Sequence, residues 1–150
     1  MKRLRERIRP SKQLVTEPSY WNAKYATDEF IYTKTANRFV IELCEGLTPG
    51  LAIDLAGGEG RNTVWLAEQG WRVENVDISE VGLAKCEAFA AERGVSERVS
   101  TLCASGADFK STLAPVDLAI VPYLQVPAAL LNASLKNLIS QIKPGGYLVG

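Results

Sequence analysis

The sequence predicts one α/β domain built on a doubly wound parallel sheet. Three observations predict it: strand-like and helix-like segments alternate along the chain, the strand candidates are short and apolar, and a glycine cluster follows the first of them. At 150 residues the chain has the length of one such domain and is too short for a second large one. We assign the domain to residues 19–150 and a basic N-terminal tail to residues 1–18.

Glycine and proline mark the ends of the expected helices. The helical pattern over 36–47 stops at Pro49-Gly50, and Gly70 and Gly94 are placed to end the next two helices. Pro144-Gly145-Gly146 closes the last helix before a short final strand. In chain order we expect a helix at 36–47, a strand at 51–55, a helix at 62–69, a strand at 72–76, a helix at 80–93, strands at 99–104 and 116–121, a helix at 131–142 and a strand at 147–149.

The helix that begins after Ser79 has a face of small residues. Ser79 is a good N-cap, and Val81, Ala84, Ala88 and Ala91 lie on one side of the expected helix. Because small side chains allow close approach, we expect this face to pack on the sheet.

Composition excludes several kinds of chemistry. The chain has no histidine, which excludes a histidine general base, a Ser-His-Asp triad and a histidine-ligated zinc. Cys44, Cys86 and Cys103 are far apart and form no C-x-x-C pair, so we expect reduced, buried thiols in a cytoplasmic protein and no metal site. No run of 18 apolar residues is present, and we expect neither a membrane span nor a secretory signal.

Charge is concentrated at the N-terminus. The chain has 17 basic and 17 acidic residues, but residues 1–12 hold six cations and one acid, a net charge of +5. We interpret this segment as a solvated tail that is dispensable for folding, and contact with an acidic partner or nucleic acid is the alternative. Because the charge of the whole chain is balanced, nucleic acid is not expected as a partner.

The turn after the first strand is the expected ligand site, since ligands bind at the carboxyl ends of strands in such sheets. It runs from Asp54 to Gly60 and contains Gly57, Gly58 and Gly60, which leave room for a ligand next to the backbone. A tight turn without a ligand is the alternative. The chain contains no Walker A string, and the third glycine of a dinucleotide fingerprint is replaced by Thr63.

A second acidic residue supports a cofactor that contains adenosine. Asp77 ends the second strand, 23 residues after Asp54, where a carboxylate can accept hydrogen bonds from both ribose hydroxyls. Capping of the adjacent helix is the alternative role. Facing an open cleft, Asp77 is expected to contribute little to folding stability.

These motifs resemble motif I and the strand-two acid of the class I S-adenosylmethionine-dependent methyltransferases. The strings from Gly58 to Asn62, 65–70 and 76–79 are similar to the tellurite-resistance-type small bacterial methyltransferases, as are Trp21-x-x-x-Tyr25 and the turn at 122–127. The resemblance implies a Rossmann-like sheet, an S-adenosyl-L-methionine cofactor and an N-terminal segment that lies over that cofactor. It covers 21–150.

The resemblance and the strand ends together give the candidate cofactor-binding residues. They are Trp21, Tyr25, Asp54, Ala56, Gly57, Gly58, Gly60, Asn62, Asp77, Ile78, Ser105 and Pro122. Ala56 replaces the first glycine of motif I, and we expect it to have a negative φ. Ser105 stands where the family often has an acid near the adenine amino group, so Asp108 or the backbone is expected to help there.

We therefore predict a methyltransferase that acts on a small molecule by in-line displacement, with no assigned catalytic residue. Tyr25 and Tyr123 either orient or deprotonate the acceptor, or they pack. A nicotinamide-dependent oxidoreductase and a non-catalytic cofactor-binding module are the alternatives. The family's sheet has more strands than this chain supplies, so we expect a truncation after the fifth strand, or a partner that covers its edge.

Overall fold

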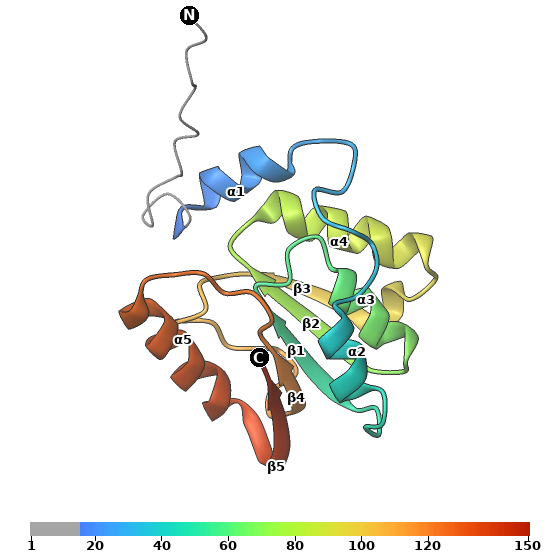
Figure 1. Cartoon of the computed structure of the whole chain (residues 1–150), viewed down its shortest axis with the longest axis vertical. Coiled ribbons are helices and arrows are strands. Elements are labelled where there is room, and N and C mark those ends of the chain that lie inside the picture. Colours follow the sequence, from blue (N-terminus) through green and yellow to red (C-terminus); the bar gives the residue numbers. More distant parts are fainter. Residues whose placement is uncertain (1–15) are drawn as a thin grey trace, which may run out of the picture.

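The computed structural model describes residues 16–150 and contains a five-stranded parallel sheet with helices on both faces (Figure 1). The strand order is β3-β2-β1-β4-β5. The elements are α1 (Pro18–Tyr25), α2 (Arg38–Cys44), β1 (Leu51–Leu55), α3 (Arg61–Glu68), β2 (Arg72–Asp77), α4 (Glu80–Glu92), a 3-10 turn η2 (Ser96–Arg98), β3 (Val99–Cys103), β4 (Val116–Ile120), α5 (Ala128–Ser140) and β5 (Ile142–Val149).

Two apolar cores hold the layers together. On one face of the sheet, Val64 of α3 and Phe89 of α4 belong to the same buried cluster as Val73 of β2. On the other face, Leu138 of α5 is buried with Ile53 of β1. The chain changes face between β3 and β4, so strand order reverses next to β1, which is where such sheets bind ligands. The predicted doubly wound α/β fold is confirmed.

The buried face of α4 differs from the prediction. Leu83, Cys86 and Phe89 point into the core, while Ala84 and Ala88 are exposed. Alanine is compatible with both environments, so the larger side chains decide which face is buried, because they remove more apolar surface from water.

The last strand is longer than predicted, and Ile142 belongs to it and not to the preceding helix. Val116 pairs with Ile142 and Leu118 with Tyr147, so β5 places three more residues than β4 between these pairs. Pro144-Gly145-Gly146 lies in this bulge, where Gly145 has a φ of 81°. A proline that looked like the end of a helix is therefore an irregularity within an edge strand.

The free edge of β5 carries exposed apolar side chains. Tyr147 and Leu148 are 54% and 42% exposed, and among residues 16–150 β5 pairs only with β4. A segment or partner that covers this edge stays a prediction.

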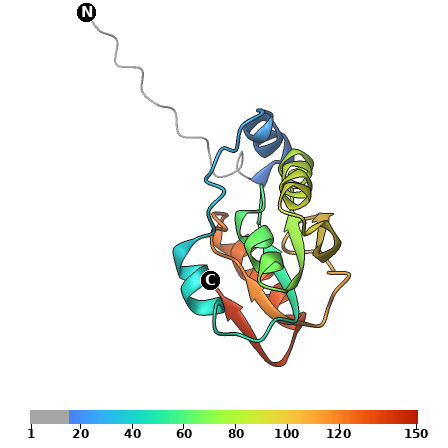
Figure 2. The same cartoon turned by 90° about the vertical axis from the view of Figure 1, so that its right-hand side faces the viewer.

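Helix α1 lies beside α4 at one end of the sheet (Figure 2). Pro18 is its first residue, a position where proline is favoured because no helical partner exists for an N–H there. The basic residues 1–12, which we expect to form the dispensable tail, lie outside the described residues. None of the helices between residues 16 and 150 has the length and apolar character needed to span a membrane.

Candidate cofactor site

A cavity of about 1230 Å³ opens at the carboxyl ends of the strands. The glycine loop after β1, the ends of β2 and β3 and the segment after β4 form its walls, and α1 lies over it. Of the predicted site residues, those that line it are Trp21, Tyr25, Ala56, Gly57, Gly60, Asn62, Asp77, Ile78, Ser105 and Pro122. Asp54 and Gly58 lie behind this wall and do not line it.

Ala56 departs from the prediction, because its φ is +58° and not negative. This left-handed conformation costs a residue with a Cβ roughly 1–2 kcal/mol. The turn is held there by the backbone N–H of Ala56, which donates to the carbonyl of Val76 at 2.7 Å. The loop therefore keeps the geometry that a glycine would give, at some cost in stability.

The glycines of the loop are required by packing inside the protein as well as by access to the cavity. A Cβ on Gly57 would overlap the Asn75 side chain, one on Gly58 would lie 2.6 Å from the Tyr25 hydroxyl, and one on Gly60 would overlap the Cys86 sulfur. The cluster of glycines in this loop therefore does not by itself indicate a bound ligand. Gly60 is the N-cap of helix α3 and supplies no side-chain hydrogen bond. Arg61 and Asn62, the first two residues of the helix, line the cavity, whereas the N–H of Thr63 faces the Asp54 carboxylate.

Asp54 is fully buried at the end of β1. Its Oδ2 accepts a hydrogen bond from the Thr63 hydroxyl at 2.7 Å, while Oδ1 has no partner among the described residues. Burial raises the pKa of Asp54 to about 7, an effect that the Thr63 hydrogen bond and the charge of Arg61 oppose. A cationic group that reached this carboxylate, directly or through water, would favour its ionised form.

Asp77 forms part of the cavity wall and is tied to two backbone groups. Its Oδ2 accepts from the N–H of Gly58 and its Oδ1 from the N–H of Ser79, both at 2.9 Å. The carboxylate thus joins the glycine loop to the start of α4, which is a larger structural role than predicted. Each oxygen retains a second lone pair for a ligand hydroxyl, so both of the roles weighed from the sequence are compatible with this geometry.

Helix α1 covers the cavity through an aromatic pair. The rings of Trp21 and Tyr25 stack with centroids 5.7 Å apart. Burial first, and then the negative charge of Asp77, raises the pKa of Tyr25. A neutral Tyr25 hydroxyl can donate a hydrogen bond at physiological pH but is a poor general base.

Two asparagines that hold the site together differ in how well the sequence indicated them. Asn62 Oδ1 accepts from the N–H of Asn37 at 2.7 Å, which fixes the segment before α2. Asn22 was not predicted, but its Oδ1 accepts from the Ser79 hydroxyl at 2.7 Å and so attaches α1 to α4. Nothing in its local sequence pattern distinguishes Asn22 from a solvent-exposed helix residue.

The adenine end of the predicted site is only partly as expected. Ser105 lines the cavity, whereas Asp108, the alternative at this end, does not. Cys103 also lines the cavity and is exposed, contrary to the expectation that all three thiols are buried. It lies at the end of an outer strand, β3, which pairs only with β2 among the described strands.

The open parallel sheet, the reversal of strand order beside β1, the glycine loop and the acid that ends β2 define a Rossmann-like cofactor-binding protein. The chain belongs to the methyltransferase domain family, whose model matches residues 52–146. The prediction of a methyltransferase domain is thereby confirmed. The finer similarity to the tellurite-resistance-type enzymes stays a prediction.

Curated relatives match part of the chain. The tRNA 5-carboxymethoxyuridine methyltransferase of Escherichia coli K12 is 31% identical over 97 residues, which cover 64% of this chain and 37% of the relative. The ribosomal RNA small subunit methyltransferase C of Alcanivorax borkumensis is 30% identical over 105 residues, 67% of this chain and 31% of the relative. The chain therefore spans about a third of the length of these relatives.

Solved structures share the fold at low sequence identity. A structure that describes the conversion of a disulfide bond into a thioacetal group during echinomycin biosynthesis has a TM-score of 0.76 and 20% identity, and the match covers 87% of this chain and 58% of that one. A methyltransferase of Geobacter sulfurreducens in complex with S-adenosyl-L-homocysteine has a TM-score of 0.64 and 20% identity, with 91% and 53% covered. At these identities the similarity supports the fold alone.

Proposed function

We propose that this chain binds S-adenosylmethionine in the cavity and transfers its methyl group to a small-molecule acceptor. One observation carries the proposal: the glycine loop, Asp77 and the end of β3 converge on one cavity in a chain of the methyltransferase domain family. The solved structure from Geobacter sulfurreducens, which has the same fold, is described as S-adenosylmethionine-dependent.

The residues present fit this cofactor in charge and in hydrogen-bonding capacity. Asp54 lies behind the cavity wall, so its unpartnered Oδ1 would reach an ammonium group near the glycine loop through water. The free lone pairs of Asp77 would suit the ribose hydroxyls, and Ile78 and Ser105 would hold the adenine, while Pro122 also lines the cavity. Trp21 and Tyr25 would cover the bound molecule and exclude water.

S-adenosylmethionine would supply a methyl group bound to a positively charged sulfur. The neutral thioether of S-adenosylhomocysteine is then the leaving group, and it is a good one. The task left to the chain is to hold an acceptor atom in line with that methyl group at near-attack distance. Tyr25, with its raised pKa, orients by donating a hydrogen bond and does not take a proton. Tyr123 is 59% exposed and lines the cavity, and its hydroxyl accepts a hydrogen bond from Nδ2 of Asn37 at 3.2 Å, so its exposed ring is the part that would contact the acceptor.

Calorimetry with S-adenosylmethionine, S-adenosylhomocysteine and NAD in parallel tests the cofactor. We expect both adenosyl compounds to bind and NAD not to bind. Binding of NAD alone would return the assignment to an oxidoreductase. Transfer of a radiolabelled methyl group to a panel of small acceptors then separates an enzyme from a module that only binds cofactor.

RNA is a second candidate acceptor. The names of the two curated relatives assign them to tRNA and ribosomal RNA, and residues 1–12 of this chain carry a net charge of +5. If RNA is the acceptor, deletion of residues 2–12 should weaken RNA binding and reduce its salt dependence. If a small molecule is the acceptor, methyl transfer should be insensitive to that deletion. The cytoplasm is the location that we propose for either activity.

A further inference from the structure

Glu59 is the one residue between Gly58 and Gly60 in the loop that lines the cavity, and its carboxylate is almost completely buried. The carboxylate accepts hydrogen bonds from two successive backbone groups of a distant segment. The N–H of Ile31 lies 3.0 and 2.9 Å from its two oxygens, and the N–H of Tyr32 lies 3.0 Å from Oε1. A residue of the glycine loop therefore holds the chain that follows α1.

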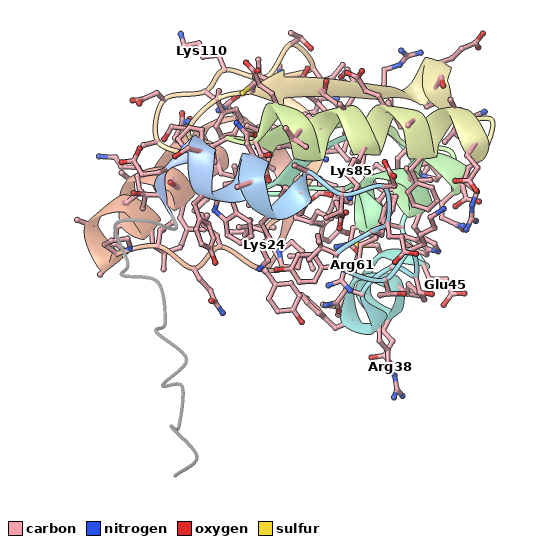
Figure 3. The ribbon with its side chains drawn as sticks, turned by 90° about the horizontal axis from the view of Figure 1, so that it is seen from above. Lys24, Arg38, Glu45, Arg61, Lys85 and Lys110 are labelled. Carbon is pink, nitrogen blue, oxygen red and sulfur yellow. The ribbon has the colours of Figure 1, made fainter. Side chains whose placement is uncertain are left out.

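Lys85 completes this arrangement from α4. Its Nζ lies 2.7 Å from Glu59 Oε2 and also donates to the carbonyl of Glu29 at 2.5 Å. Figure 3 shows Lys85 reaching from α4 toward the segment after α1. The side chains of Lys85 and Glu59 are 14% and 3% exposed, so solvent screens this ion pair little.

The segment held by Glu59 forms one wall of the cavity. Tyr32 lines the cavity, and its hydroxyl accepts from Nζ of Lys24 at 3.0 Å. Lys24 in turn lies over the ring of Trp21, 4.9 Å from its centroid. A continuous set of contacts thus leads from the glycine loop through Glu59 to Tyr32, Lys24 and the aromatic cover on α1.

We propose that Glu59 is a positioning residue that couples occupation of the glycine loop to the ordering of residues 29–33, and so places Tyr32 and Lys24 at the cavity wall. The inference rests on the proposed function. A ligand that fixes the loop also fixes the Glu59 carboxylate, and by linkage an ordered segment raises the affinity of the loop for that ligand. A purely structural ion pair would stabilise the fold without this coupling.

The test uses hydrogen exchange of peptides that cover residues 29–33, with and without S-adenosylhomocysteine, together with calorimetric affinity and melting temperature. Glu59→Gln removes the charge and keeps one acceptor oxygen. Lys85→Met removes the ion pair, and Lys85→Arg is the conservative variant that retains it. Glu92→Gln is the matched control, because Glu92 forms an exposed ion pair with Lys34, the residue directly after this segment, and does not line the cavity.

In the wild type we expect S-adenosylhomocysteine to slow exchange at residues 29–33 about tenfold. Glu59→Gln and Lys85→Met should lose that protection and bind the ligand about tenfold more weakly, while Lys85→Arg and Glu92→Gln should keep both properties. Variants that melt earlier but retain the wild-type affinity and ligand-dependent protection would overturn the proposal. Absence of binding to the wild type would instead overturn the proposed function.

Discussion

Asp54 and Asn75 are register partners on strands β1 and β2, and each has a buried side-chain oxygen without a hydrogen-bond partner among the described residues. The side chains of both residues border the position that a Cβ on Gly57 would fill. Unsatisfied buried oxygens are costly, and two of them side by side at the glycine loop mark a place where a proton or a donor group would stabilise the protein.

Asp54→Asn should change how stability depends on pH. The raised pKa of about 7 means that the folded state keeps a proton which the unfolded state releases near pH 4. Wild-type stability contributed by this group is thus present below about pH 4, falls as pH rises toward about 7, and falls no further above it. Urea unfolding of both proteins from pH 4 to 8 measures their free energies of unfolding. As the pH rises, the stability of Asp54→Asn relative to the wild type should increase. If the free energies of unfolding of both proteins depend on pH in the same way, Asp54 is ionised in the folded state over the whole range from pH 4 to 8.

The sequence predicted the sheet because its signals are local. Short apolar runs ended by glycine, such as 51–55, have one structural interpretation when helical segments alternate with them. The buried face of α4 could not be predicted in the same way, because alanines at 84, 88 and 91 fit either environment and the choice depends on what Leu83 and Phe89 contact.

The residues of the candidate site could likewise be predicted only where the signal is local in the sequence. Asp77 could be found because it ends a strand at a fixed distance from a glycine loop. Glu59 could not, since its partners are backbone groups of Ile31 and Tyr32, 28 and 27 residues away, and a glutamate between two glycines gives no sign of them. The positive φ of Ala56 could not be predicted either, because the hydrogen bond from its N–H to the carbonyl of Val76 overrides the local preference of alanine for a negative φ.

Thiol labelling should report on the ligand at the end of β3. Cys103 is exposed and lines the cavity, whereas Cys44 and Cys86 are buried, and burial raises the pKa of Cys86 to about 12. We expect one thiol to react readily in the native protein, and S-adenosylhomocysteine to slow that reaction at least severalfold. Mass spectrometry identifies the site, and Cys103→Ser should abolish the fast phase. Unchanged labelling with saturating ligand would place the adenosyl group away from β3.

Tryptophan fluorescence should report on α1. Trp21 lines the cavity, while Trp71 is only 2% exposed and Trp65 does not line the cavity. If Trp21 covers the cofactor, binding of S-adenosylmethionine should quench the emission of the wild type and leave that of Trp21→Phe almost unchanged. Trp65→Phe serves as the control and should retain the quenching. Full quenching in Trp21→Phe would show that another tryptophan senses the ligand and that Trp21 only packs on Tyr25.

Asp77→Ala separates the ligand role of this carboxylate from its structural role. The variant leaves the N–H groups of Gly58 and Ser79 without their acceptor, so we expect a loss of about 1–3 kcal/mol in the free energy of unfolding, more than the sequence alone predicted. If the carboxylate also accepts the ribose hydroxyls, affinity for S-adenosylhomocysteine should fall by about ten- to several-hundredfold, since each 1.4 kcal/mol is a factor of ten.

Asp117→Ala is the matched control for that measurement. Asp117 also accepts a backbone hydrogen bond, from the N–H of Leu51 at 2.8 Å, and it pairs with Lys143, but it lies at the start of β4 and does not line the cavity. Its loss should lower stability and leave affinity within about twofold of the wild type, a difference of less than about 0.5 kcal/mol. Calorimetry and urea unfolding on both variants therefore distinguish the two roles. If Asp77→Ala behaves like Asp117→Ala, with reduced stability and unchanged affinity, Asp77 only joins the loop to α4 and the ribose binds elsewhere.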